Sequence, residues 1–383
     1  MQSTSIVGLV AIATLAAAAG CADVASTDAT NESAVASTSE ALKKPTPPAP
    51  ATVNVGYFSR SPVMAFAQTN GYFTDENLTV SEFQTPSSPV IFTNLRAGTW
   101  QIILTQSDNV FNYRYNASNP IGATFDPVII AGQDHSNGAS LVTNGALTTC
   151  DAIKGKTLDV DSPNSGFAFV AYGILRSKCS FEKGTDYLVK VTGGTPGRYA
   201  NLIAGRSDMT ILNAGYQFRA EAQGFFEFGK ITDAASPYMG TGAVATRTWL
   251  DANGDVATRF LRALRRGTDW VLDPNNKSAV VAWLTTDAAG DTNVANNAYA
   301  VLLSEDQGLI PHVRLDKKGL YEVAQLRDSF GCFDQPENLR FLTSPRSGMY
   351  DLSYWRDSFK GGHDGPCDDD DDHGHGHGGH GHH

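Results

Sequence analysis

Cysteine and histidine are scarce in this chain. Its 383 residues include 5 Cys and 9 His, and His135 and His312 are the only histidines between residues 52 and 362. No Cys-x-x-Cys pair and no Cys2His2 spacing occurs, which excludes the structural zinc modules that depend on those spacings. With so few histidines, no Ser–His–Asp arrangement stands out, and the sequence gives no sign of a hydrolase triad.

Basic charge is also low. The chain has 29 Lys and Arg against 40 Asp and Glu, and its formal net charge is −11. One Asp run at 368–372 supplies five of the negative charges, so the remainder is mildly acidic. An acidic surface repels phosphate backbones, which argues against nucleic acid as a partner. After the N-terminus no segment reaches the roughly 20 apolar residues of a membrane span.

The N-terminus carries the one long apolar run. Ile6 to Ala19 has no charge and leads into Gly20-Cys21, which resembles a bacterial lipobox with Cys21 as the lipidated residue. Ala18 stands where Leu is usual, and the leader has no Lys or Arg, so an ordinary secretory signal is the alternative. Either way we expect export to the periplasm or cell surface, with a lipoprotein anchor in the membrane as the favoured form. Residues 1–21 are then a signal peptide, and 22–51, rich in Ser, Thr, Ala and Pro, a disordered tether.

The stretch from Val191 to Phe225 illustrates how the folded part is built. Thr195 can cap a helix with Pro196 in its first turn, and Gly205 can end that helix. Asp208 to Leu212 has the pattern of a buried strand, and a polar turn and a second helix follow. Similar strands are expected at 53–58, 78–83, 101–105, 128–131, 141–143 and 157–160. This alternation predicts an α/β chain whose ligands bind at the turns after the carboxyl ends of strands.

A family resemblance rests on the same stretch. GGTPGRYANLIAGRSDMTILNAG at 193–215 resembles the second-lobe signature of the SsuA/THI5-like (NMT1-like) substrate-binding proteins of ABC importers for nitrate, sulfonates, taurine or thiamine precursors. Other passages agree in the same order: VNVGY at 53–57, AQTNGYFTDENLTV at 67–80, LRAG at 95–98 with the strand and turn at 102–108, and IKGK at 153–156. Each passage alone is common, but the ordered set is specific for the family over about residues 52 to 330.

The resemblance implies a two-lobed α/β fold of the type II periplasmic-binding-protein kind, with two open mixed sheets, a hinge and a ligand cleft between them. The expected divisions are 52–138 for the first part of lobe 1, 139–238 for lobe 2, 239–330 for the return to lobe 1 with the C-terminal helices, 331–362 for a C-terminal extension and 363–383 for a disordered Asp/His/Gly-rich tail. It also implies a monomer that binds a small molecule, works with an ABC transporter permease, and needs no catalytic residues and no cofactor.

Eleven residues at strand-to-helix turns are the candidate ligand contacts, because helix N–H groups and short polar side chains converge there. Arg60 is a candidate anion clamp, with a surface salt bridge as the alternative, and Tyr216 can stack on a planar ligand or pack in the core. Ser107, Asp108 and Ser165 have helix capping as their structural alternative. The full set is Ser59, Arg60, Gln106, Ser107, Asp108, Asn164, Ser165, Gly166, Thr195, Asn213 and Tyr216.

The remaining cysteines and the tail add two expectations. Export permits disulfides, and Cys150 and Cys179 flank one strand–turn–helix unit, which favours a bond between them; Cys332 and Cys367 remain as a second possible pair. Imidazoles alternating with glycine form a flexible ligand set for zinc, nickel or copper, against the alternatives of an affinity tag or a solvated acidic tail. These histidines are His373, His375, His377, His380, His382 and His383.

Three classes of function remain open at this level. The tether and the two-lobed layout favour an importer's binding lipoprotein that captures a small organic anion or planar metabolite. Thiamine-pyrimidine synthases share the implied fold, but the Cys-rich cluster of those enzymes is absent here. A metal-scavenging surface protein is the third class, and the His-rich tail is its only support.

Overall fold

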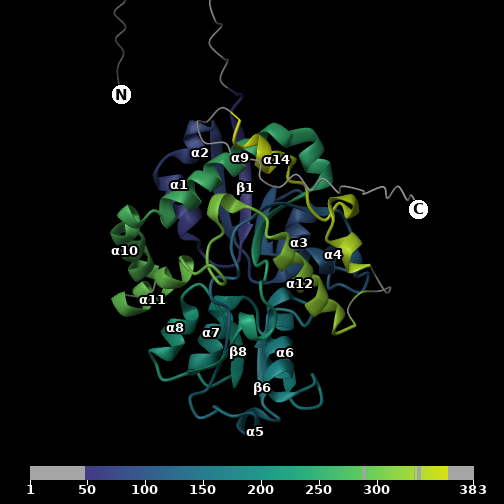
Figure 1. Ribbon diagram of the computed structural model, residues 1–383, viewed down its shortest axis with the longest axis vertical. Coiled ribbons are helices and arrows are strands. Elements are labelled where there is room, and N and C mark those ends of the chain that lie inside the picture. Colours follow the sequence, from purple (N-terminus) through teal and green to yellow (C-terminus); the bar gives the residue numbers. More distant parts are fainter. Residues whose placement is uncertain (1–47, 288–289, 332, 334–337, 361–383) are drawn as a thin grey trace, which may run out of the picture. The chain divides into compact units, whose positions relative to one another are not determined.

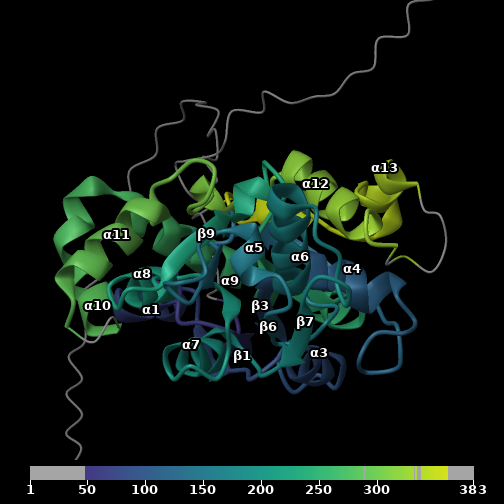
Figure 2. The ribbon, with the colours of Figure 1, turned by 90° about the horizontal axis from the view of Figure 1, so that it is seen from below.

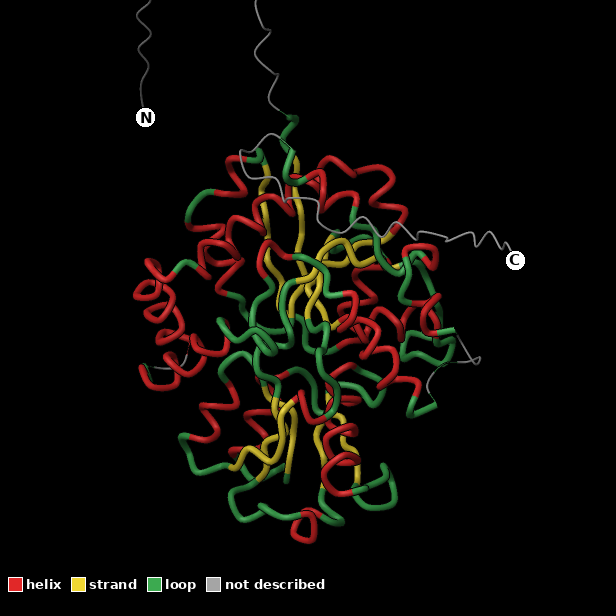
Figure 3. Tube along the Cα trace, viewed as in Figure 1, coloured by secondary structure: helices red, strands yellow, loops and turns green. Residues whose placement is uncertain are grey.

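Two five-stranded mixed sheets form the framework of the computed structural model, which describes residues 48–287, 290–331, 333 and 338–360. Figure 3 shows the strands gathered in two separate groups, each surrounded by helices. Each sheet with its helices is called a lobe here. The predicted signal peptide, Cys21, the tether up to residue 47 and the His-rich tail lie outside the described residues, as do Cys332 and Cys367.

The first sheet has the strand order β2-β1-β3-β10-β4. β1 is parallel to β2 and β3, whereas β10 is antiparallel to β3 and β4. Val53 and Val55 of β1 and all of β3 and β4 are buried, as expected for strands that helices cover on both faces. The strands are β1 Ala51–Tyr57, β2 Leu78–Gln84, β3 Ile102–Gln106, β4 Pro127–Gly132 and β10 Thr241–Thr246.

The second sheet repeats this plan with the order β7-β6-β8-β5-β9. β6 is parallel to β7 and β8, and β5 is antiparallel to β8 and β9. Its strands are β5 Ser140–Thr143, β6 Thr157–Val160, β7 Leu188–Val191, β8 Met209–Leu212 and β9 Phe226–Lys230. The chain enters this lobe between β4 and β5 and leaves it between β9 and β10, so it crosses between the lobes twice.

Helices cover both sheets, as Figure 1 shows. Gly267 of α9 allows a close approach to α1, because a Cβ there would lie 2.7 Å from the Val63 carbonyl oxygen. The helices of the first lobe are α1 Pro62–Thr69, α2 Tyr72–Asp75, α3 Ser88–Arg96, α4 Ser107–Tyr115 and α9 Arg247–Leu272. Those of the second are α5 Cys150–Ile153, α6 Gly166–Cys179, α7 Thr195–Ile203, α8 Tyr216–Glu221 and the short 3-10 helix η1 Ile231–Asp233.

The C-terminal helices reach the second lobe on two flanks. Figures 1 and 2 show α10 and α11 on one side of the lobes and α12 on the other, and α11 contacts α8 while α12 contacts α4 and α6. These elements are η2 Pro274–Asn276, α10 Lys277–Asp287, α11 Thr292–Leu302, η3 Pro311–Val313, α12 Lys317–Asp328, α13 Leu339–Leu342, η4 Pro345–Ser347 and α14 Ser353–Asp357. No helix in the described part of the chain is long and apolar enough to cross a membrane.

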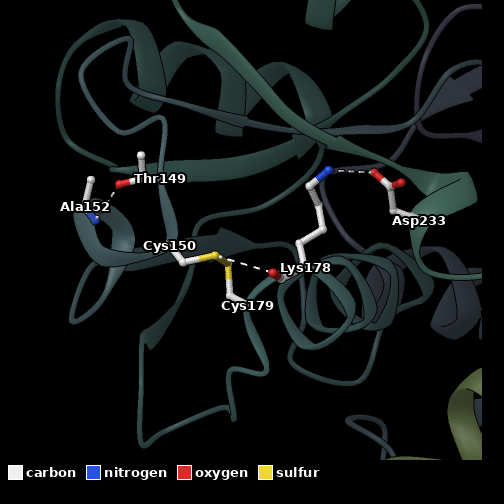
Figure 4. Close-up of a disulfide and its surroundings, with 6 residues drawn as sticks. All are labelled: Thr149, Cys150, Ala152, Lys178, Cys179 and Asp233. Carbon is white, nitrogen blue, oxygen red and sulfur yellow. Dashed lines mark hydrogen bonds and ion pairs between the residues drawn. A yellow bond between two sulfur atoms is a disulfide. The ribbon is translucent and has the colours of Figure 1, made fainter.

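The predicted disulfide between Cys150 and Cys179 is present (Figure 4). It joins the start of α5 to the end of α6, with the two Cα atoms 5.5 Å apart. The closed loop spans 29 positions, and a loop of that length corresponds to roughly 3–4 kcal/mol of stabilisation in the chain-entropy treatment.

Two predicted helix caps differ from the structure. Gln106, rather than Ser107 or Asp108, is the N-cap of α4, and its side chain makes no capping bond. Gly194, rather than Thr195, is the N-cap of α7, so that Thr195 occupies the first helical position. Ser165 does cap α6 as predicted, because its Oγ accepts a hydrogen bond from the Ala168 N–H.

Candidate functional site

A small cavity lies where the turns of the two lobes meet. Its volume is about 50 Å³, several times the 10–15 Å³ or so that one water molecule needs. The second lobe contributes Phe167, Asn213 and Ala214. The first lobe and the crossing after β4 contribute Tyr57, Phe58, Ser59, Arg60, Ser61, Leu104, Thr105, Gln106, Gln133, Asp134, Asn137 and Thr241. We call this space the central cavity.

The backbone is strained where the chain crosses beside the central cavity. Ser136, Asn137 and Gly138 follow one another with φ values of 74°, 48° and 67°, and Ala214 has a φ of 51°. Positive φ is costly for residues other than glycine, and such strain concentrates at binding sites that the surrounding fold holds in place. A hydrogen bond of 3.2 Å from the Ala214 N–H to the Asn137 carbonyl joins the two strained turns.

Three buried polar atoms of residues in the cavity wall have no hydrogen-bond partner in the described chain. They are Ser59 Oγ, Gln133 Oε1 and Asn137 Oδ1. Buried polar groups are nearly always hydrogen-bonded, and one left unpaired costs about 1–3 kcal/mol. Three such atoms in the wall of one cavity indicate a place that a polar ligand or ordered water completes.

Asp134 is a fully buried carboxylate in the same wall. Its Oδ1 accepts N–H bonds from Ser136 at 2.7 Å and Thr241 at 3.0 Å, and its Oδ2 accepts one from Asn137 Nδ2 at 2.9 Å. Within the described residues no Lys, Arg or His forms an ion pair with it. Burial raises the pKa of this carboxyl to about 6, although the N–H bonds act in the opposite direction.

Arg60, which the sequence analysis offered as an anion clamp, is exposed and lines the central cavity. Its guanidinium carbon is 5.3 Å from the centre of the Trp283 ring, so a cation–π contact holds it. Arg60 and Trp283 also line a neighbouring space of about 30 Å³, which shares Asn137 and Ala214 with the central cavity. Asp287 lines this second space, and burial raises the pKa of its carboxyl while Arg60 and Arg219 lower it.

Ser59, Arg60, Gln106 and Asn213 are the predicted residues that line the central cavity. Gln106 is buried, and its Oε1 accepts a bond of 2.8 Å from Ser136 Oγ. Asn213 Oδ1 accepts a bond of 3.2 Å from Thr195 Oγ1, which itself accepts one from Arg198. Thr195 therefore positions Asn213 and does not line the cavity.

Ser107 and Asp108 were predicted to contact the ligand, but the structure places them outside the central cavity wall. Ser107 Oγ donates to the Met239 carbonyl. Asp108 receives two bonds from Arg327, at 2.9 Å from Nε and 2.7 Å from Nη2, and both side chains are buried. Neither residue lines the central cavity, and partners within the fold occupy their polar atoms.

The N-terminus of α6 is likewise not an open anion cradle. The Gly166 N–H donates to Asn109 Oδ1 at 2.9 Å, and a Cβ on Gly166 would lie 3.0 Å from the Cβ of Gln106. Asn164 offers its carbonyl to Arg327 at 2.8 Å, and Ser165 Oγ donates to Asp161 at 2.6 Å. The first lobe thus covers the turn that the sequence predicted to be the best anion site.

Tyr216 lies away from the central cavity. Its ring centre is 5.3 Å from that of Tyr199, and the Arg219 guanidinium carbon is 4.8 Å from each of the two ring centres. The aromatic residues that line the cavity are Tyr57, Phe58 and Phe167. These three rings, and not Tyr216, present aromatic surface to the cavity.

Polar contacts join the two lobes beside the central cavity. Asp161 of the second lobe accepts from the Ser88 N–H at 3.1 Å and from Ser88 Oγ at 2.5 Å. The Gly194 N–H donates to the Pro86 carbonyl at 2.7 Å. Arg327 of α12 binds Asp108 of the first lobe and the Asn164 carbonyl of the second. These bonds hold the two lobes together beside the central cavity.

The sequence analysis missed Gln133, Asp134 and Asn137 as site residues. The signal was present, because the polar run from Gln133 to Asn137 follows directly on the buried strand β4. The six tail histidines lie outside the described residues. Within the described residues, no group of three or more His, Cys, Asp or Glu could hold a metal ion.

Comparison with known proteins gives a family match and several solved structures of similar fold. The family model described as NMT1/THI5 like matches residues 61–277. No curated protein matches the chain. Similar solved structures include the periplasmic nitrate-binding protein NrtA from Synechocystis PCC 6803, with 12% identity and a TM-score of 0.66 over 81% of this chain and 88% of that chain.

Two further structures show the same likeness. The alkanesulfonate-binding protein SsuA from Xanthomonas axonopodis pv. citri, solved bound to MOPS, has 13% identity and a TM-score of 0.61 over 79% of this chain and 99% of that chain. A ligand-binding component of an ABC-type import system from Staphylococcus aureus, solved with zinc bound, has 13% identity and a TM-score of 0.62 over 80% and 98%. Likeness at this identity concerns the fold, and it confirms the predicted two-lobed periplasmic-binding-protein class.

Proposed function

The chain belongs to the NMT1/THI5-like family, and on that premise we propose that it is an exported solute-binding protein of an ABC importer. The observation that carries the proposal is the central cavity, whose wall combines residues of both lobes with unpaired buried polar atoms. A ligand that contacts both lobes stabilises the closed arrangement over an open one by those differential contacts. Recognition of that closed form by a permease is how such a protein delivers its solute.

The ligand in this proposal is a small organic anion or planar metabolite. Arg60 supports an anionic group at the exposed side, because a guanidinium pairs well with carboxylate or sulfonate oxygens. Phe167, Tyr57 and Phe58 supply aromatic surface in the wall. The cavity volume of about 50 Å³ corresponds to roughly three to five water molecules. In the closed form it can therefore enclose only a small part of the ligand.

Native mass spectrometry of the purified full chain tests the binding proposal by detecting a co-purified small molecule. Arg60→Ala should weaken binding of an anionic hit about tenfold, the loss of one partly solvated charge-assisted bond. Arg96→Ala, an exposed arginine on α3 outside the cavity wall, is the matched control and should bind normally. An empty protein that also binds no sulfonate, carboxylate or pyrimidine in a thermal-shift screen contradicts the proposal.

A lipid anchor at Cys21 is the second part of the proposal, and Gly20-Cys21 at the end of the apolar run supports it. Anchoring would keep the binding protein close to the permease that it serves. Replacement of Cys21→Ser should move the protein from the membrane fraction to the soluble fraction after cell lysis. Retention of the Cys21→Ser protein in the membrane fraction contradicts the anchor.

A further inference from the structure

At one end the central cavity is lined by a buried carboxyl group that has no ion-pair partner among the described residues. Asp134 has no exposed surface, and no ion pair to it exists within the described part of the chain. Its Oδ1 already accepts two backbone N–H bonds, but its Oδ2 accepts only the one from Asn137. A carboxylate oxygen has room for two bonds, so Oδ2 retains acceptor capacity beside the cavity.

Asn137 adds a second acceptor at the same end. Its amide orientation is fixed, because its NH2 group donates to Asp134 Oδ2 and a flipped amide would bring two oxygens together. Asn137 Oδ1 is therefore an acceptor, and it is buried and unpaired. Ser59 Oγ, also unpaired, can accept as well as donate. Gln133 can present either end of its amide, because its partner Ser61 is a hydroxyl group.

The acceptor oxygens of Asp134 and Asn137 disfavour an oxyanion without donor groups at this end of the cavity. An oxyanion has only acceptor oxygens, and it would face a carboxylate and an amide oxygen that also need donors. Buried charges are normally paired, since an isolated one is strongly disfavoured in a protein interior. A group with several N–H donors satisfies Asp134 and Asn137 together, and a positive charge on that group supplies the missing counter-charge.

We propose that the central cavity binds a small amino-bearing metabolite whose amino group bonds to Asp134 Oδ2 and Asn137 Oδ1. The acidic or planar remainder of the ligand then lies toward Arg60, at the exposed side. This inference rests on the proposed function and narrows its ligand class. Asp134 is the residue that distinguishes amino-bearing compounds from amino-free ones of the same size.

Three matched pairs of probes differ only in the amino group: 2-aminoethanesulfonate and ethanesulfonate, β-alanine and propionate, and 4-aminopyrimidine and pyrimidine. Isothermal titration with the full chain should give, in at least one pair, about ten- to a hundredfold tighter binding of the amino compound, the range for one bond to a charged group. Asp134→Asn should abolish that difference. Asp151→Asn, an exposed carboxylate of α5 outside the cavity wall, should preserve it.

A second variant tests the other proposed acceptor of the amino group independently. Asn137→Gly removes the amide but suits the positive φ at this position, and it should also reduce the preference for the amino compound. Binding of β-alanine should weaken about tenfold from pH 7 to pH 5, because the Asp134 carboxylate that pairs with its amino group becomes protonated. The one titratable side chain whose charge acts on the Asp134 carboxyl is His135, which is bonded to Asp316, and the Asp134→Asn variant retains both His135 and Asp316.

Equal binding of the two members in every pair that binds overturns the inference and leaves the proposed function intact. A preference for the amino compound that persists in Asp134→Asn also overturns it. If no pair binds, the inference fails, and the native mass spectrum then decides separately whether the proposed function fails with it.

Discussion

Replacing Asp134 by Asn should stabilise the ligand-free protein at neutral pH and have little effect at pH 4. The pKa of this buried carboxyl is about 6 in the folded protein against an ordinary value of 3.8. Because the folded-state pKa is raised, the protonated Asp134 carboxyl stabilises the folded natural chain. This contribution is complete below about pH 4 and is lost as the pH rises through 6. A difference of about two pKa units corresponds to about 3 kcal/mol, since each unit is worth 1.36 kcal/mol.

Urea denaturation followed by circular dichroism at pH 4, 5, 6 and 7.5 measures this effect on the free energy of unfolding. The quantity of interest is the unfolding free energy of Asp134→Asn minus that of the natural chain, because all other titrations are common to both proteins. It should rise by about 2–3 kcal/mol from the lowest to the highest pH. Asp151→Asn should show no such rise, as its carboxyl is exposed.

A flat difference for Asp134→Asn across this pH range would refute the reasoning. It would mean that the Asp134 carboxylate ionises inside the fold without cost, and hence that some unrecognised cation or donor already compensates it. Native mass spectrometry of the same preparation must show no bound small molecule, because an amino ligand would itself supply that compensation.

Three other predictions follow from the contacts described above. Arg327→Met should lower the free energy of unfolding by about 3–5 kcal/mol in urea, because it leaves Asp108 buried without its partner; an unchanged midpoint would contradict this. Loss of the disulfide in the double variant Cys150→Ser and Cys179→Ser should cost roughly 3–4 kcal/mol, again by urea denaturation. A chain that ends at Lys360 should take up less zinc or nickel in isothermal titration than the full chain, and equal uptake would remove the tail histidines as ligands.

The element order could be predicted because the strands are short apolar runs bounded by polar turns. Leu78–Gln84 and Met209–Leu212 lie where the pattern placed them, within one residue at either end. The strand Phe226–Lys230 escaped prediction, since it lies at the edge of its sheet and its pattern includes exposed and charged residues. Which of two sheets a strand joins depends on non-local pairing, and only the family resemblance supplied that.

The candidate site was predictable as a set of turns, but not residue by residue. Asp108 and Gly166 stand at the expected strand ends, yet Arg327 and Asn109 occupy their polar groups. Such partners lie far away in sequence, and no local pattern reveals which polar groups lobe packing will use. The sequence shows that Asp134 offers two acceptor oxygens after β4. That this carboxyl is buried and has no ion-pair partner among the described residues is evident only in the folded chain.

The place of β10 in the first sheet has a consequence for the order of events during synthesis. β10 lies between β3 and β4, so the ladder that joins them is incomplete until residues 241–246 have left the ribosome. The second sheet draws all its strands from the continuous segment 140–230, which is made earlier. The lobe that begins first along the chain is therefore finished last, and until then β3 and β4 have unpaired edges that favour association with other chains.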